Sequence, residues 1–191
     1  MAHVSIIGTG NMGQAIAGVA GKGGHTVQLL GQSDSATAVT GDIVVLAVPY
    51  PAVSAVIAER GNTLAGKIVV DITNPLNFET FDSLTVPAGS SAAAQIQAQL
   101  PNATVLKAFN TTFAATLGAK KVGELATTVL IAGDDTAAKQ SLAAAVEAGG
   151  VSAIDAGALS RAHELEALGF LQLTLAVGEK ISWTGGFAVV R

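Results

Sequence analysis

Short apolar runs alternate with longer alanine-rich segments along this 191-residue chain, and this alternation constrains the fold more than any other feature. The runs are β-branched and apolar on successive positions, as expected for strands that are covered on both faces. They span residues 4–7, 26–30, 43–48, 68–72, 104–109, 127–132 and 151–154. Repeated strand–helix alternation predicts an α/β fold, with a mostly parallel sheet and helices on both of its faces.

The segments between the runs predict the helices. They cover residues 11–21, 52–60, 90–99, 134–147 and 160–178, and Asp134-Asp135 is typical of an acidic helix start. Only about a dozen residues separate the second and third runs, which is near the minimum for a parallel crossover. We therefore expect a helix of one or two turns there, around residues 34–39. The absence of a linker or a repeat predicts a single domain over residues 1–191, with a C-terminal helix and tail from about residue 158.

Composition excludes several classes of protein. Hydrophobic residues make up 50% of the chain but aromatics only 4%, so the core must be aliphatic, and 13% charged residues argue against disorder. The net charge of −4 predicts no nucleic-acid partner and no anionic-membrane partner. The chain has no cysteine, which excludes disulfides and thiolate chemistry. Because no signal peptide or membrane-spanning run is recognisable, we expect a cytoplasmic location.

The sequence Gly8-Thr9-Gly10-Asn11-Met12-Gly13 follows the first predicted strand directly and opens the first predicted helix. A G-x-G-x-x-G sequence in that position is typical of a dinucleotide-binding turn. Gly8 permits the tight turn, Gly10 lets the backbone approach a pyrophosphate, and Gly13 lets the helix pack closely on the strand. Free N–H groups at the helix N-terminus then bind the anion. A turn without a ligand is the alternative, but its position favours dinucleotide binding and predicts a Rossmann-type, doubly wound sheet.

The residues after the second predicted strand bear on the choice between NADP(H) and NAD(H). A carboxylate at that strand tip binds the adenosine ribose hydroxyls and repels a 2′-phosphate. Here Gly31, Gln32 and Ser33 come first, and Asp34 follows as the expected N-cap of the short helix. We therefore favour NADP(H), with Gln32 and Ser33 contacting the 2′-phosphate. NAD(H) is the alternative, because no arginine follows the strand.

Ligands of such a sheet lie beyond the carboxyl ends of its strands, where loops from several strands meet. The predicted cofactor contacts from the later loops are Val48, Pro49, Asn74, Pro75 and Asn110. The predicted acceptor-side contacts are Thr111, Thr112 and Ala114. Alternative interpretations stay open for these loops: the prolines as the start of the next helix, and the asparagines as ordinary turn residues.

The chain offers few proton donors for a carbonyl reduction. His3 and His25 lie at the amino ends of their strands, and Tyr50 is on a proline-bracketed loop. His163 is in the last helix, where pairing with Glu164 or Glu166 is the simpler interpretation, and Lys107 ends the fifth strand. We assign no catalytic acid or base and predict hydride transfer to a flavin or deazaflavin, in which catalysis mainly brings two rings together.

These segments together resemble the NADPH-dependent reductases of the deazaflavin coenzyme F-420 and the related oxidoreductase domain of the STEAP metalloreductases. The resemblance rests on the glycine motif, Ala47-Val48-Pro49, Asp71-Ile72-Thr73-Asn74-Pro75 and the segment from Val105 to Thr111, and it continues in Ala132-Gly133-Asp134-Asp135 and Asp155-Ala156-Gly157. It implies an NADPH-dependent oxidoreductase that reduces a deazaflavin, a flavin or, through flavin, a metal. Members of this family carry a basic residue just after the second strand, where this chain has Gln32 and Ser33.

The C-terminal tail, residues 181–191, is apolar, jointed by glycines and holds the one tryptophan, Trp183. Such a tail either folds over the acceptor site or packs on a second subunit, and we favour a homodimer. Two functions follow from the sequence. The first is an oxidoreductase acting on a small-molecule redox acceptor, and the second is a non-catalytic NADP(H)-binding redox sensor.

Overall fold

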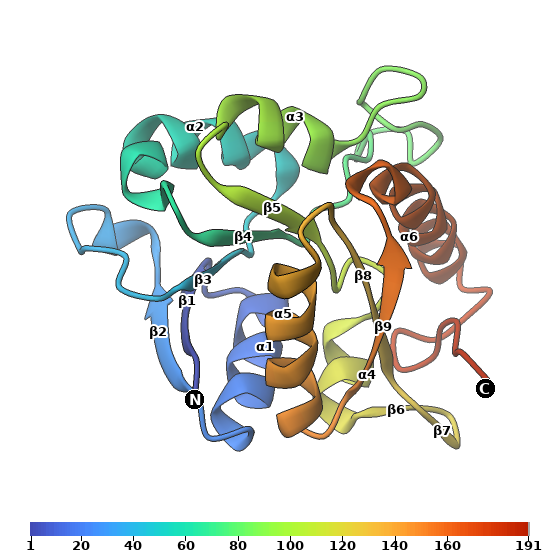
Figure 1. The fold of residues 1–191 in the computed structure, drawn as a ribbon. Helices are drawn as coiled ribbons and strands as arrows, with labels where there is room; N and C mark the ends of the chain where they lie inside the picture. The colour runs from blue at the N-terminus through green and yellow to red at the C-terminus, as the bar shows by residue number, and fades with distance from the viewer. Residues whose placement is uncertain (191) are drawn as a thin grey trace.

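The computed structural model describes residues 1–190 and arranges them around a seven-stranded sheet with the order β2-β1-β3-β4-β5-β8-β9 (Figure 1). The strands of this sheet are β1 (His3–Ile7), β2 (Thr26–Leu30), β3 (Ile43–Leu46), β4 (Ile68–Asp71), β5 (Thr104–Lys107), β8 (Thr128–Ala132) and β9 (Ser152–Gly157). The α-helices are α1 (Asn11–Lys22), α2 (Tyr50–Arg60), α3 (Ala92–Gln99), α4 (Ala114–Ala119), α5 (Thr136–Ala148) and α6 (Ala162–Val177). Every predicted apolar run becomes a strand of this sheet, which confirms the α/β class.

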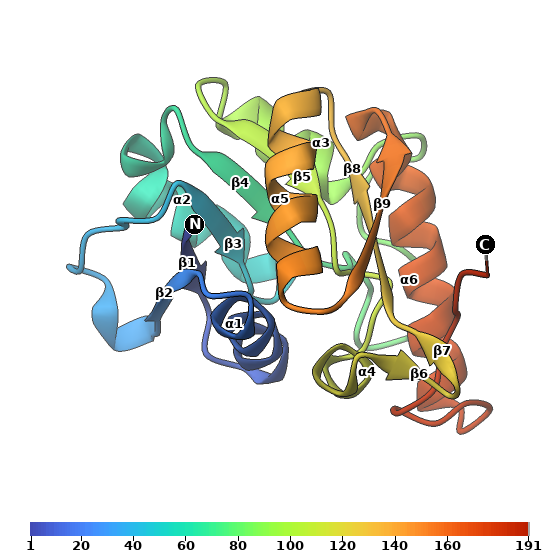
Figure 2. The same ribbon diagram turned by 60° about the horizontal axis from the view of Figure 1, so that its bottom comes forward.

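Helices cover both faces of the sheet because its strands are apolar on both sides. On one face Val4 and Ile6 of β1 join a core with Ile16 of α1 and Leu142 of α5. On the other face, strand residues such as Val44 pack in a second core with side chains of α2 and α3. Figure 2 shows α1 and α5 together in front of the sheet, with α2 and α3 behind it. These two buried layers confirm the expected doubly wound arrangement.

The strand order reverses direction at β1, which pairs in parallel with β2 on one side and with β3 on the other. The chain leaves β1 at Gly8 and leaves β3 at Ala47, so the two loops start next to each other. Ala47 N–H donates to the carbonyl oxygen of Ile7 at 2.8 Å, which continues the pairing beyond the strand ends. Ligands of open α/β sheets bind in the crevice at this kind of switch point.

The short helix expected around residues 34–39 is not formed, and that prediction was wrong. The structure has a single 3₁₀ turn, Gln32–Asp34, followed by an irregular segment. Asp34 does not cap a following helix, because its carboxylate accepts a 2.8 Å hydrogen bond from Gly31 N–H within this turn.

The far side of the sheet departs from a fully parallel arrangement. β8 pairs antiparallel with β5 through Lys107 and Ala132, while β9 lies parallel to β8. The helix α4 and the hairpin of β6 (Lys121–Val122) and β7 (Leu125–Ala126), which the sequence analysis did not identify, occupy the connection from β5 to β8. The chain leaves β5 and enters β8 at the same edge of the sheet, without crossing one of its faces. β8 therefore runs opposite to β5.

A buried cluster of charges fixes α6 to the carboxyl edge of the sheet. Lys107 Nζ lies 2.8 Å from Asp71 Oδ2 and 2.9 Å from Glu166 Oε1, and all three side chains are 0% exposed. The backbone N–H groups of Ala92 and Ala93, at the start of α3, also donate to the Glu166 carboxylate. Burial raises the pKa of Glu166 above its usual range, and Lys107 opposes this shift. The cluster therefore joins β4, β5, α3 and α6.

Replacing Lys107 with methionine should leave two buried carboxylates without their shared cation. Breaking a buried ion pair from one side costs about 3–5 kcal/mol, so we expect Lys107→Met to lower the free energy of unfolding by that amount. Urea unfolding followed by circular dichroism measures the effect. Lys121→Met, at an exposed position, is the matched control and should change stability by less than about 0.5 kcal/mol. Equal losses for the two variants would contradict a structural role for the cluster.

Candidate functional site

The turn after β1 is held against the end of β3 at van der Waals distance. Gly8 has φ +122°, a conformation that side chains disfavour, and a Cβ there would lie 2.1 Å from the carbonyl oxygen of Ala47. Gly8 N–H also donates to the carbonyl oxygen of Leu30 at 2.8 Å. Gly8 therefore brings the ends of β1, β2 and β3 together, as the tight turn predicts.

The other two glycines of the motif differ in their surroundings. A Cβ on Gly13 would lie 2.1 Å from the carbonyl oxygen of Gly8, so Gly13 lets α1 approach the turn. A Cβ on Gly10 would meet nothing within 4 Å, and Gly10 has an ordinary extended backbone at the N-cap of α1. Gly8 and Gly13 are thus required by the fold, whereas Gly10 leaves open space beside the helix terminus.

The N-terminus of α1 has no side-chain cap. Ser91 accepts from Ala94 N–H to cap α3, and Asp135 accepts from Ala138 N–H to cap α5, whereas α2, α4 and α6 resemble α1 in having no side-chain cap among residues 1–190. Uncapped N–H groups at a helix start, together with the helix dipole, favour an anion. The loop that precedes α1 therefore has the geometry of an anion-binding turn.

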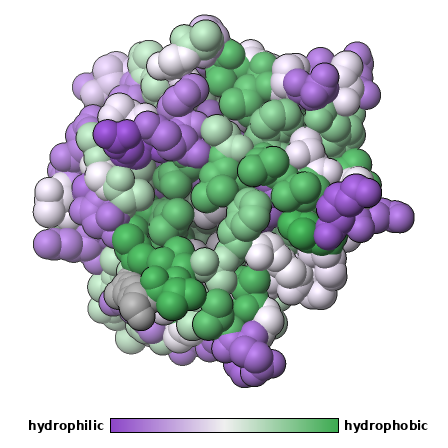
Figure 3. All heavy atoms as spheres, turned by 90° about the vertical axis from the view of Figure 1, so that its right-hand side faces the viewer, coloured by the Kyte–Doolittle hydropathy of each residue, from purple (hydrophilic) through white to green (hydrophobic). Residues whose placement is uncertain are grey.

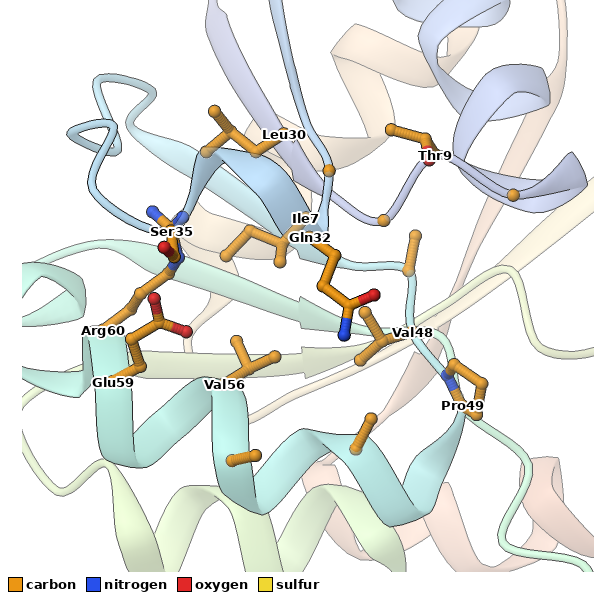
Figure 4. A pocket seen from close by; sticks show the side chains of 16 residues that line it. Ile7, Thr9, Leu30, Gln32, Ser35, Val48, Pro49, Val56, Glu59 and Arg60 are labelled. Carbon is orange, nitrogen blue, oxygen red and sulfur yellow. The ribbon is translucent and has the colours of Figure 1, made fainter.

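A cavity of about 450 Å³ opens on one side of this turn, between β2 and α2 (Figure 4). The structure brings many of the predicted cofactor residues to its wall: Gly8, Thr9, Gly10, Gly31, Gln32, Val48 and Pro49. Pro49 is also the N-cap of α2 and Pro51 lies in its first turn, so the two interpretations of these prolines both apply. Nine further wall residues were not identified as site residues from the sequence, among them Ser35, Val56, Glu59 and Arg60.

A second cavity of about 370 Å³ lies on the opposite side of the same turn. It is lined by predicted cofactor and acceptor residues Asn11, Met12, Asn74, Asn110, Thr112 and Ala114. Trp183 of the tail also lines it, and its ring packs on Phe113 with ring centroids 5.0 Å apart. The tail therefore folds back over this cavity, one of the two arrangements expected for it. The start of α1 separates the two cavities.

Two asparagine side chains bind each other at the rim of the second cavity. Asn110 Nδ2 donates to Asn74 Oδ1 at 2.9 Å and to the carbonyl oxygen of Leu165 at 2.7 Å, and Asn74 Nδ2 donates to the carbonyl oxygen of Asn110. Asn110 is only 4% exposed, yet its Oδ1 is buried without a hydrogen-bond partner in the part of the chain described. Because an unpaired buried oxygen costs about 1–3 kcal/mol, this atom suits a ligand that donates an N–H.

Several sequence-predicted residues lie outside both cavity walls. Gly13 packs beneath the turn, Ser33 is exposed on the 3₁₀ turn, and Pro75 is buried beside Thr85. Thr111 is 7% exposed, and its carbonyl oxygen accepts from Gln172 of α6, so it does not face the acceptor side as expected. The buried residues Gly13, Pro75 and Thr111 support the loops from behind, and Ser33 is exposed outside both walls.

The candidate proton donors also lie away from the cavities. Lys107 is sealed within its charge cluster. His163 is exposed, and its Nδ1 lies 3.0 Å from the carbonyl oxygen of Ser90; the expected pairing with a glutamate is wrong, because Glu164 binds Arg161. Tyr50 donates to Gln95 at 2.7 Å, and burial raises its pKa. None of these side chains lines the second cavity.

Across residues 1–190, no helix combines the length and apolar character needed to cross a membrane. Within that same range, no group of three or more His, Cys, Asp or Glu side chains is placed to hold a metal ion.

The chain is similar to known oxidoreductases in sequence and in structure. Residues 27–75 match the family model described as NADP oxidoreductase, coenzyme F420-dependent. The F420-dependent NADP reductase of Methanocaldococcus jannaschii is 31% identical over 166 residues, which are 85% of this chain and 74% of that protein. The metalloreductase STEAP3 of Rattus norvegicus is 37% identical over 106 residues, which are 55% of this chain and 20% of that protein.

The structural comparison covers the entire fold. A crystal structure from Arthrobacter sp. FB24, of a protein proposed to be an F420-dependent NADP reductase, superposes with a TM-score of 0.83. It covers 100% of both chains at 26% sequence identity. The match therefore includes α6 and the tail as well as the parallel half of the sheet.

The different surroundings of Gly10 and Gly13 predict that an added methyl group lowers stability at position 13 but not at position 10. Gly13→Ala places a Cβ against a backbone oxygen that cannot move without opening the turn, so we expect the melting temperature to fall by several degrees, corresponding to about 1–3 kcal/mol. Gly10→Ala, the matched control, enters open space and should shift it by about 1 °C or less. Differential scanning calorimetry compares the two variants. A larger loss for Gly10→Ala would show that the turn is not packed as described.

Proposed function

This chain belongs to the family of F420-dependent NADP reductases, as its motifs predict, and on that premise we propose that it transfers a hydride between NADP(H) and a flavin or deazaflavin. The observation that carries the proposal is the placement of two cavities on either side of the uncapped start of α1. A dinucleotide bound with its pyrophosphate at that turn would place its adenosine in the first cavity. Its nicotinamide would enter the second cavity.

The residues present fit such a cofactor. The open space at Gly10 gives the pyrophosphate access to the backbone N–H groups of α1. The unpaired Asn110 Oδ1 is an acceptor for the amide N–H of a nicotinamide carboxamide. Val48 and Pro49 give the first cavity an apolar, stiff part of its wall. When bound, NADPH supplies the hydride, and the chain supplies the binding and orientation.

The lining of the second cavity supports an acceptor that needs no protein acid. Its described wall residues include no Asp, Glu, His, Lys, Arg or Tyr. Instead, Phe113, Ala114, Ala115 and Trp183 present apolar surface on which a planar ring can pack. Exclusion of water and alignment of two rings are the contributions that such a surface makes to hydride transfer.

An anaerobic stopped-flow experiment tests the reaction. We expect NADPH to be oxidised when FMN, FAD or coenzyme F420 is added to the protein, with the nicotinamide absorbance falling as the acceptor is reduced. Gly10→Val should abolish this reaction and weaken NADPH binding about 100-fold or more, because two branched carbons would enter the space beside the N–H groups. Tight NADPH binding without oxidation by any of the acceptors would favour the alternative, a redox sensor.

We also propose that the protein forms a homodimer through α6 and the tail. No charged residue occurs between positions 167 and 177, although α6 lies at the surface. Figure 3 shows apolar residues gathered on the face that α6 and the tail form. The exposed members on these two segments are Leu171, Val177, Trp183, Phe187, Val189 and Val190. A patch of this kind is typical of a contact between subunits.

Leu171→Lys should convert the homodimer to a monomer, because it buries a charge in the contact. Light scattering coupled to size-exclusion chromatography measures the mass. Phe78→Lys is the matched control, since Phe78 is similarly exposed at 52% but lies on the loop between β4 and α3. This variant should leave the mass unchanged. A monomeric wild-type protein would refute this proposal without affecting the proposed reaction.

A further inference from the structure

Arg60 is a buried cation without a carboxylate partner among residues 1–190. Its residue is 6% exposed, at the C-terminal end of α2. The other buried charged residues are Asp71, Lys107, Lys139 and Glu166, and each has an oppositely charged partner within 4.0 Å. Among residues 1–190, Arg60 has no such partner. Because buried charges are nearly always paired, this exception points to an anion that binds from outside the chain.

The guanidinium is positioned by the loop after β2. Arg60 Nη1 donates to the carbonyl oxygen of Thr37 at 2.7 Å, and Nη2 donates to the carbonyl oxygen of Asp34. These two neutral acceptors hold the side chain in place but leave its charge uncompensated. A guanidinium carries five N–H donors, and these two hydrogen bonds use two of them.

The same guanidinium belongs to the wall of the first cavity, together with Gln32, Ser35 and Glu59 (Figure 4). This wall is at the loop after β2, where proteins of this fold distinguish the 2′ position of the adenosine ribose. Ser33, which the sequence suggested for this role, lies outside the wall. Arginine binds phosphate through several N–H groups at once, which a neutral Ser or Gln cannot reproduce.

We propose that Arg60 binds the 2′-phosphate of NADP(H) and is the residue that makes this chain prefer NADP(H) to NAD(H). The inference rests on the proposed binding of a pyridine dinucleotide. On this assignment, Arg60 at the end of α2 is the cation that is missing directly after β2. Two carboxylates oppose the preference because they repel a phosphate: Glu59, an exposed neighbour on the same wall, and Asp34, which accepts from Gly31 N–H at the tip of β2.

Isothermal titration of NADPH, NADH, 2′,5′-ADP and 5′-ADP tests the assignment by affinity alone. Arg60→Met should weaken NADPH and 2′,5′-ADP binding about 10- to 100-fold, since hydrogen bonds to a charged group are lost. It should change NADH and 5′-ADP binding less than about 3-fold. Glu59→Gln, which retains the arginine, should strengthen NADPH binding relative to NADH by about 2- to 5-fold.

A matched control separates phosphate binding from support of the loop. Lys67 Nζ donates to the carbonyl oxygen of Gly41 at 2.7 Å, so it also ties a cation to the β2–β3 connection, but it does not line the cavity. Lys67→Met should therefore leave the ratio of NADPH to NADH affinity unchanged. Thermal unfolding of every variant shows whether the fold is retained. Should Arg60→Met fail to fold, Arg60→Lys replaces it, with an expected 3- to 10-fold loss in the ratio.

Three results would overturn the assignment. The first is that Arg60→Met, or its replacement, retains the wild-type ratio of NADPH to NADH affinity, and the second is that it weakens the binding of all four ligands equally. In either case Arg60 supports the loop or contacts the adenine and does not bind the 2′-phosphate. Failure of the proposed function gives a different pattern, in which the wild-type protein itself binds neither dinucleotide. A wild-type protein that binds NADH as tightly as NADPH would refute the preference and leave dinucleotide binding intact.

Discussion

The close contact between Gly8 and Ala47 is the constraint on which the rest of the site depends. A Cβ at position 8 would fall 2.1 Å from a backbone oxygen, so the exits of β1 and β3 can lie side by side only without a side chain there. This contact sets the direction in which α1 begins. The start of the helix then divides the crevice into two cavities of different chemistry.

The second cavity depends on contacts between segments that are far apart in the sequence. Lys107 holds Asp71 and Glu166 together, and a few residues beyond, Asn110 binds Asn74 and the backbone of Leu165. Both sets of contacts join the carboxyl ends of β4 and β5 to α6. The charged cluster and the amide pair therefore keep α6 close to the strand ends, and α6 in turn carries the tail that places Trp183 over the cavity.

Local patterns were sufficient to predict the strands, the glycine turn and most loop residues of the site. Gly8, Val48 and Asn74 each lie within three residues of the carboxyl end of a buried strand. Because these strands are parallel, the three residues meet at one edge of the sheet. Arg60 and Trp183 could not be found in this way. Arg60 reaches the loop after β2 from the far end of a helix, and Trp183 returns to the crevice only after α6 has packed. The sequence also suggested Lys107 as a proton donor, because the pattern does not reveal that two carboxylates enclose it.

The two cavities differ in the side chains that line them: charged groups lie at the first, and neutral groups line the second. In the first, Arg60 and the N-terminus of α1 provide positive electrostatic potential, which suits a ligand that carries phosphates. The second offers neutral amides, a hydroxyl and apolar rings, and its described wall residues include no ionisable side chain. Fixed charge at a distance from the reacting atoms can supply affinity without altering the electronics of the rings. Selectivity for the nucleotide and reactivity toward the acceptor can thus be changed independently in this fold.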